Sequence, residues 1–265
     1  LATPEELTLP EGDFTGIGKP LYSDVGPLKT KIRQSLIFGY KEPVSRPCKL
    51  GRVRTPEGLI DPMMKGLKKC GKPSEGLNLR YLKAASNNVR QLFTRDEERQ
   101  KVLSNMEAVT GREDDEYSTP IKRTTSAGYP LKKETEGKPG KTKWLGSDED
   151  YELAEEIEEM IVAREEFARQ NKRFPTIWTD TLKDERRPHE KVLAGKTRVF
   201  SAGPMDFIIA MRKYFLGFTA HCAANRNYNE ISVGTNVCSS DWDVIASLMR
   251  THGQHVIAGD FSNFD

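Results

Sequence analysis

A stretch rich in glycine and proline interrupts this chain between residue 111 and about residue 147, and it limits the folds open to the chain. Glycine and proline break both helices and strands, so neither element runs through it. Loops of this length without secondary structure are usually functional or disordered, and the segment Thr125-Ser126-Ala127-Gly128-Tyr129-Pro130 favours an ordered, functional loop. The other turn-forming residues of the stretch are Gly137, Pro139, Gly140 and Gly146.

Segments with helical and with strand periodicity flank this loop. Apolar residues recur every three or four positions in the predicted helices, whereas the strands are short runs bounded by turn residues. The chain has 265 residues, enough for one large domain or two ordinary ones. These patterns predict a mixed α/β fold. The predicted elements are helices within Leu77–Val109, at 153–167, Met205–Phe218 and Ser240–His252, and strands at Thr176–Lys183, Lys196–Ser201 and His255–Phe261.

Charge is segregated along the chain, although its formal net charge is only +2. Nine lysines and arginines stand against two acids between Lys19 and Arg54, whereas ten acids stand against one base between Asp148 and Glu166. The basic segment fits contact with nucleic-acid phosphates, and equally fits a solubilising surface. The acidic segment is interpreted as the solvated face of a helix.

The sequence shows no pattern for a membrane span, a targeting peptide or a zinc site. No apolar run approaches the roughly 20 residues that span a bilayer, and the sequence from Leu1 does not resemble a targeting peptide. The four cysteines lie far apart without metal-ligand spacing, which indicates free intracellular thiols. We therefore expect a soluble chain.

Asp260 and Asp265 form a pair five residues apart near the end of the sequence. This spacing alone is common, and a surface turn would explain it. The apolar residues Val256-Ile257-Ala258-Gly259 precede Asp260, so its carboxylate would emerge from a packed sheet, where a charge needs a metal or a cation. Oxygen ligands of this kind suit Mg²⁺. Asp260 is thus a candidate metal ligand.

A basic pair of strands is predicted around residues 176–201. Alternation in Lys196-Thr197-Arg198-Val199-Phe200 places Lys196, Arg198 and Phe200 on one face. Two cations on one strand could neutralise a triphosphate, with Arg adding bidentate geometry. A basic surface hairpin without a ligand remains the alternative. The segment Thr124–Pro130 could likewise present hydroxyl and N–H groups to a nucleic-acid backbone, or be a plain tight turn.

These motifs, in this order, resemble those of picornavirus-like RNA-dependent RNA polymerases. Thr125–Pro130 resembles motif G at template entry. Lys183-Asp184-Glu185-Arg186-Arg187 followed by Gly195-Lys196-Thr197-Arg198 resembles motif F of the nucleotide channel. Gly259–Asp265 resembles motif A. The sequences of Arg198–Pro204 and of motif A are similar to those of insect dicistrovirus polymerases, with iflaviruses or other picorna-like viruses next. The resemblance runs from about residue 18 to the last residue.

The resemblance implies a right-hand polymerase fold, of which this chain carries the fingers and the first strand of an incomplete palm. The implied division is an extended fingertip segment over 1–60, fingers over 61–254 and a palm strand over 255–265. The fingers contain a template-entry loop at 111–147 and a nucleotide-channel hairpin at 176–201. Motifs B, C, D and E of the family lie downstream of motif A and are absent here, so the chain is expected to be inactive alone.

The resemblance also implies roles for individual residues. Asp260 would be a catalytic metal ligand and Asp265 would read the ribose 2′-hydroxyl, with two Mg²⁺ or Mn²⁺ ions in the complete enzyme. Thr125, Ser126 and Gly128 would guide template RNA. The residues implied to bind the NTP triphosphate are Lys183, Arg187, Lys191, Lys196 and Arg198.

The implied partners are template and primer RNA, NTPs, the C-terminal half of the polymerase and other viral replication proteins. The implied location is the cytoplasm of the infected host cell, at membrane-associated replication complexes. An unpaired palm-strand edge would favour self-association of the chain. The alternative function is a non-enzymatic RNA-binding module. A reverse transcriptase shares the palm aspartate, but it does not explain the sequences that resemble motifs G and F.

Overall fold

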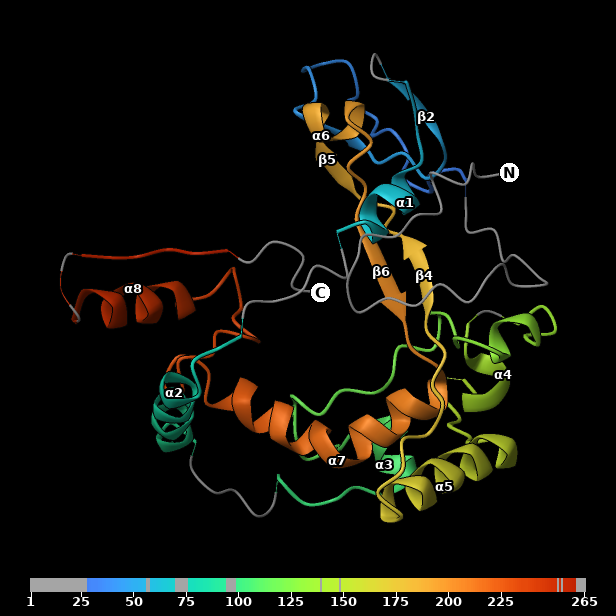
Figure 1. Cartoon of the computed structure of the whole chain (residues 1–265), viewed down its shortest axis with the longest axis vertical. Coiled ribbons are helices and arrows are strands. Elements are labelled where there is room, and N and C mark those ends of the chain that lie inside the picture. The colour runs from blue at the N-terminus through green and yellow to red at the C-terminus, as the bar shows by residue number, and fades with distance from the viewer. Residues whose placement is uncertain are drawn as a thin grey trace. The chain divides into compact units, whose positions relative to one another are not determined.

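The computed structural model describes residues 28–55, 58–69, 76–93, 99–138, 140–147, 149–251, 253 and 255–260. Helices and short strands are both present, which confirms the mixed fold class (Figure 1). The chain forms two compact units. The described residues up to Gly76, Thr179–Ala202 and Asp260 belong to the first unit, and Leu77–Trp178 with Gly203–Gly259 form the second. The predicted division at residues 60 and 254 stays a prediction.

The first unit contains three antiparallel strand pairs. The predicted hairpin is present as β4 (Thr179–Leu182) paired with β6 (Val199–Ala202), with Leu182 opposite Val199. The other two pairs were not predicted, because strands of three residues are too short to show a period. The remaining elements of this unit are β1 (Ser45–Pro47) paired with β5 (Arg186–Pro188), β2 (Val53–Thr55) paired with β3 (Gly58–Ile60), α1 (Pro62–Leu67) and α6 (His189–Leu193).

Segments before residue 70 hold the β4–β6 hairpin in place. The Thr30 hydroxyl and the Lys31 backbone N–H both donate to the Asp184 carboxylate, at 2.6 and 2.7 Å. The Thr197 hydroxyl donates to the Lys49 carbonyl at 2.7 Å, and Gly66 of α1 lies so close to Val199 that an added Cβ would be 2.3 Å from its methyl group. The hairpin is therefore built from residues far apart in the sequence.

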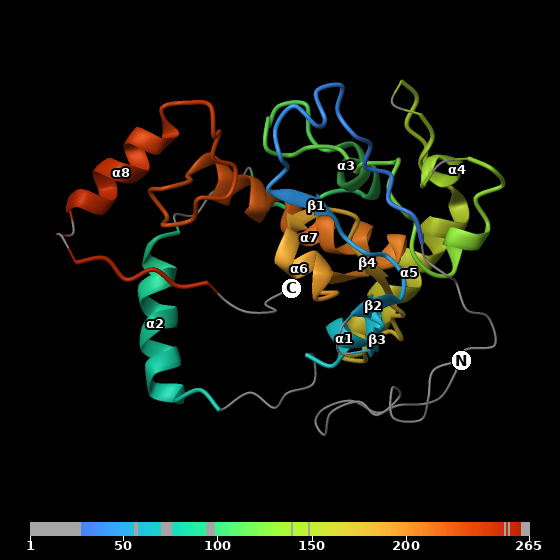
Figure 2. The same ribbon diagram turned by 90° about the horizontal axis from the view of Figure 1, so that it is seen from above.

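The second unit is mainly helical, and α3 and α5 pack against α7 (Figures 1 and 2). Ser104 begins α3 with a capping box, in which the side chains of Ser104 and Glu107 each accept a backbone N–H of the other residue. Ile157 and Ile161 of α5 are fully buried, as the predicted apolar face requires. The helices of this unit are α2 (Leu79–Gln91), α3 (Asn105–Thr110), α4 (Thr142–Leu145), α5 (Glu155–Arg169), α7 (Met205–Ala224) and α8 (Asp241–Thr251), with a 3-10 turn η2 at Leu131–Lys133.

The predicted helices correspond to α2, α3, α5, α7 and α8, and α7 continues past the predicted end at Phe218 to Ala224. No helix among the described residues is long and apolar enough to cross a membrane.

The prediction of a buried strand at His255–Phe261 is wrong for the described residues 255–260. They form no strand and are exposed, and Ile257 is fully exposed. A strand is stable only when a neighbour satisfies its backbone hydrogen bonds and covers its apolar face. None of the described strands pairs with residues 255–260.

Candidate functional site

The β4–β6 hairpin presents alternating cations on one face, as predicted. Lys196, Arg198 and Phe200 are exposed, whereas Thr197 is buried. The Lys183 backbone N–H donates to the Arg198 carbonyl at 2.8 Å, which extends the ladder by one bond beyond β4. The predicted strand from Lys196 is shorter in the structure, because β6 begins at Val199, and Lys196 and Arg198 precede it. Their exposed side chains are nevertheless available to a ligand.

Glu185 is the centre of the cationic cluster, and the sequence did not identify this role. The Arg198 guanidinium donates to both Glu185 carboxylate oxygens, with Nε to Oε1 at 2.7 Å. The Lys183 ammonium lies 3.9 Å and the Arg187 guanidinium 3.8 Å from the same carboxylate. Hydrogen bonding from Arg198 lowers the pKa of Glu185 below its usual value, although partial burial opposes the shift. Three of the five predicted nucleotide-binding cations therefore meet at one anion.

Arg46, in the basic N-terminal segment, pairs with Glu42 at 3.5 Å and lies beside this cluster. It lies directly opposite Arg187 in the β1–β5 pair. Like charges facing each other across strands are destabilising, and an anionic ligand would relieve this repulsion. The sequence indicated Arg46 only as one of the bases between Lys19 and Arg54, because no local pattern predicts that β1 pairs with β5.

Lys191 and Lys196 lie at the turn that leads into β6. The Lys191 carbonyl accepts the Lys196 backbone N–H at 2.9 Å, and Gly195 between them has a φ of +60°. Among the described residues, neither ammonium has a carboxylate partner. Both lysines are near Glu185 in the sequence, but among the described residues neither pairs with its carboxylate.

The Thr125–Pro130 segment is fixed to the core of the second unit. Ala127 is buried and its carbonyl accepts the Met205 backbone N–H at 3.0 Å. Gly128 has a φ of +78°, and a Cβ there would lie 2.6 Å from the Gly203 carbonyl oxygen. Only glycine fits this position. The bond between Tyr129 and Pro130 is cis.

The hydroxyl groups of Thr125 and Ser126 are used differently. Thr125 donates its proton to the Lys122 carbonyl at 2.7 Å and accepts from the Lys141 ammonium. Ser126 accepts the Gly128 backbone N–H at 3.2 Å, and among the described residues its own proton has no acceptor. Ser126 is therefore the hydroxyl that can donate to a ligand, whereas Thr125 and Gly128 shape the segment.

Asp260 does not form a metal site with other described residues. It is exposed, and no group of three His, Cys, Asp or Glu side chains that could hold a metal is found within the described ranges. Asp265 lies outside the described residues. One exposed carboxylate is too few ligands for Mg²⁺.

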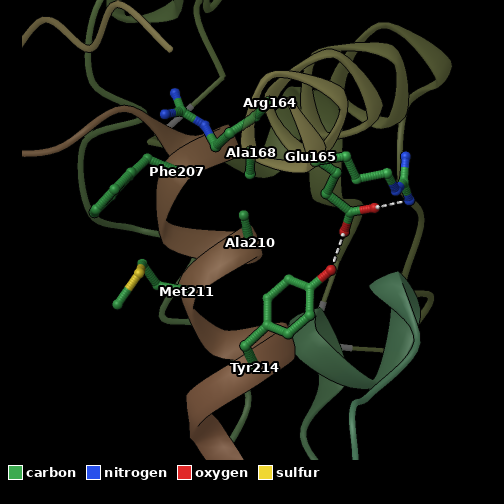
Figure 3. A pocket seen from close by; sticks show the side chains of 8 residues that line it. Arg164, Glu165, Ala168, Phe207, Ala210, Met211 and Tyr214 are labelled. Atoms are coloured by element: carbon green, nitrogen blue, oxygen red, sulfur yellow. Dashed lines mark hydrogen bonds and ion pairs between the residues drawn. The ribbon is translucent and has the colours of Figure 1, made fainter. Parts of the chain in front are cut away.

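A pocket of about 400 Å³ lies between α5 and α7 (Figure 3). Its wall contains Ala168, Ala210 and Met211, and its charged groups all have partners. Glu165 accepts from Tyr214 at 3.2 Å and pairs with Arg169, while Arg164 pairs with the buried Asp206 outside the pocket. These groups are engaged in packing the two helices, so the pocket is not assigned to a ligand.

The family model described as "Viral RNA-dependent RNA polymerase" matches residues 39–265. The chain belongs to this polymerase family. It is 42% identical over 97% of its length to the replicase polyprotein of Cricket paralysis virus, and covers 15% of that protein. It is 39% identical over 98% of its length to the replicase polyprotein of Drosophila C virus, and covers 16% of it. The predicted likeness to insect dicistrovirus polymerases is confirmed.

A solved polymerase shares the fold of this chain. The structure titled "Sicinivirus 3Dpol RNA dependent RNA polymerase" matches with a TM-score of 0.67 at 23% identity, over 89% of this chain and 47% of that one. The chain thus spans about half of the solved polymerase and about a sixth of its curated polyprotein relatives.

Proposed function

We propose that this chain is the fingers-bearing part of a viral RNA-directed RNA polymerase, which transfers nucleotides from NTPs to an RNA 3′ end on a template. The observation that carries the proposal is the meeting of Lys183, Arg187 and Arg198 on the Glu185 carboxylate. Three cations gathered on a rigid hairpin suit a triphosphate. Family membership gives this cluster its function, because it occurs within the segment that resembles motif F.

The five cations bind the triphosphate in two ways. Lys183, Arg187 and Arg198 exchange the Glu185 carboxylate for phosphate oxygens, so their positions are set before the nucleotide arrives. Lys191 and Lys196 add charge from the adjoining turn. Preorganised cations stabilise the charge that develops during phosphoryl transfer without rearranging at that moment.

Template RNA runs along the Thr125–Pro130 segment. Ser126 donates its hydroxyl proton to a backbone phosphate, and Thr125 and Gly128 hold the backbone that presents it. Contacts of this kind position a strand without reading its sequence. Binding should therefore tolerate any sequence and weaken with salt.

Asp260 and Asp265 are the catalytic carboxylates of the proposal. Asp260 supplies one ligand to Mg²⁺ or Mn²⁺, two ions being held in the complete enzyme by ligands beyond the described residues, and Asp265 reads the incoming ribose. Bound metal supplies charge neutralisation and activation of the 3′-hydroxyl. The exposure of Asp260 in this chain fits a ligand that awaits the rest of its site, and the chain alone should not polymerise.

The alternative is a non-enzymatic RNA-binding module. It is favoured by the same exposure of Asp260, since the phosphate-binding groups are assembled in the described residues and the metal ligands are not.

Substitution of Asp260→Asn in a polymerase that contains this chain separates the two functions. We expect Mg²⁺-dependent nucleotide incorporation to fall by at least about a thousandfold, with RNA affinity nearly unchanged. Asp243→Asn removes the same charge from an exposed position on α8 and should leave incorporation intact. Incorporation retained by Asp260→Asn would refute the enzymatic function and leave the binding module.

The relatives are replicase polyproteins, and this context extends the proposal to partners and location. We propose that the chain acts with the C-terminal half of the polymerase, other viral replication proteins, template and primer RNA, and NTPs. Its place is the cytoplasm of the infected cell, at membrane-associated replication complexes. The exposed apolar residues Val256 and Ile257 favour self-association of the isolated chain.

A further inference from the structure

Lys141 is a buried lysine whose backbone and side chain both hold the Thr125–Pro130 segment or the residues just before it. The residue is only 3% exposed. Its ammonium donates to the Thr125 carbonyl at 3.1 Å and to the Thr125 hydroxyl at 2.5 Å. Its backbone N–H donates to the Arg123 carbonyl at 2.7 Å. Lys141 is thus bonded to two residues of the chain that immediately precede Ser126.

The same residue is joined to the core of the second unit. Its carbonyl accepts the backbone N–H groups of Trp144 and Leu145, each at 3.0 Å, and both of these side chains are fully buried. The preceding Gly140 packs so closely that an added Cβ would lie 2.2 Å from the Arg123 carbonyl oxygen. Lys141 therefore links the buried core to the residues that precede Ser126.

The Lys141 ammonium has no carboxylate partner among the described residues. The acids of the same loop are Glu134 and Glu136, and Glu136 pairs with Lys143 instead. The bases nearest in sequence to Thr125 or Lys141 are Lys122, Arg123, Lys138 and Lys143. Burial lowers the pKa of Lys141 to about 8. An unpaired buried charge is costly, and a nearby anion would offset this cost.

We propose that Lys141 is the positioning residue of the Thr125–Pro130 segment and that its charge balances a template backbone phosphate bound at Ser126. The inference rests on the proposed function of this segment in template binding. The phosphate need not touch Lys141, because a charge in a partly buried setting acts over several ångströms with little screening. Thr125 lies between the two and fixes their separation.

Binding of single-stranded oligoadenylate to the chain at pH 7 and pH 9 tests this inference with Lys141→Met and Lys141→Arg. Methionine keeps length and burial but removes the charge, and arginine stays charged at both pH values. At pH 7, Lys141→Met should bind RNA about tenfold more weakly than wild type, as loss of one charge-assisted interaction implies. Lys138→Met removes an exposed lysine from the same loop and should cost about twofold.

The pH profile separates positioning by charge from a purely structural role. Because the pKa of Lys141 is lowered, the ammonium is charged below about pH 8 and loses its proton as pH rises above it. Wild-type affinity should therefore fall between pH 7 and pH 9 by several-fold more than that of Lys141→Arg or Lys141→Met. Equal profiles for wild type and Lys141→Arg would overturn the inference, even if Lys141→Met fails to fold.

Failure of template binding and failure of the Lys141 role give different results. A wild-type chain that does not bind RNA at pH 7 would overturn the template-binding role of the segment and this inference with it. Wild-type binding that Lys141→Met matches at both pH values would overturn the inference alone and leave the proposed function standing.

Discussion

The β4–β6 hairpin and the Thr125–Pro130 segment both present polar groups for a phosphate, but different forces hold them. Charge orders the hairpin cations, because Lys183, Arg187 and Arg198 converge on a single carboxylate at the protein surface. Close packing orders the Thr125–Pro130 segment, since Ala127 and Gly128 are buried against the start of α7. The hairpin should respond mainly to changes of charge. The segment should respond mainly to changes of shape, and charge acts on it through the single ammonium of Lys141.

This difference fits the two ligands proposed. A nucleotide must enter and leave at every cycle, and a carboxylate that yields to phosphate oxygens allows the cations to alternate between two anions. A template strand moves past one fixed donor, the Ser126 hydroxyl. That donor needs a rigid backbone, and it does not need a second anion to exchange with.

The largest expected effect comes from Gly128→Ala. Its new Cβ would lie 2.6 Å from the Gly203 carbonyl oxygen and 2.7 Å from the Pro204 Cα, in a backbone with a φ of +78°. We expect a loss of about 3 kcal/mol in the free energy of unfolding and loss of RNA binding. Gly137→Ala is the control, because Gly137 has a φ of +80° with nothing within 4 Å, and should cost about 1 kcal/mol. Equal costs, measured by chemical denaturation, would show that packing does not hold the segment.

A smaller effect is expected from Glu185→Gln. The substitution removes the anion that competes with phosphate and leaves three cations without their shared partner, so a fluorescent nucleoside triphosphate should bind about fivefold more tightly. Asp184→Asn makes the same change in net charge, but that carboxylate accepts from Thr30 and Lys31 instead. Weaker nucleotide binding in Glu185→Gln would mean that the carboxylate serves mainly to position the cations.

The smallest effect is expected from Ser126→Ala, which removes one neutral donor without disturbing the backbone. RNA affinity should fall about two- to threefold, in line with the net contribution of a single hydrogen bond. Thr124→Ala removes a neighbouring exposed hydroxyl and should leave affinity unchanged. A drop of the same size in both variants, measured by fluorescence anisotropy, would remove Ser126 from the template contact.

Much of the local structure follows from the sequence alone. The exposure of Lys196 and Arg198 and the burial of Thr197 agree with the predicted alternation, although β6 begins only at Val199. The buried face of α5 depends only on the spacing of its apolar residues. The order of the motifs likewise indicated the family, which the matched model confirmed over residues 39–265. These features are properties of neighbouring residues, so a linear sequence contains them.

The partners of the site residues are a different matter, because they depend on which distant segments meet. Glu185 and Arg198 pair only after the hairpin closes, and Arg46 faces Arg187 only because β1 adds to β5. The same dependence explains the wrong prediction at residues 255–260, where an apolar run has no described strand to pair with. The sequence thus determined which residues carry charge, and the tertiary structure decided which charges are shared, buried or left for a ligand.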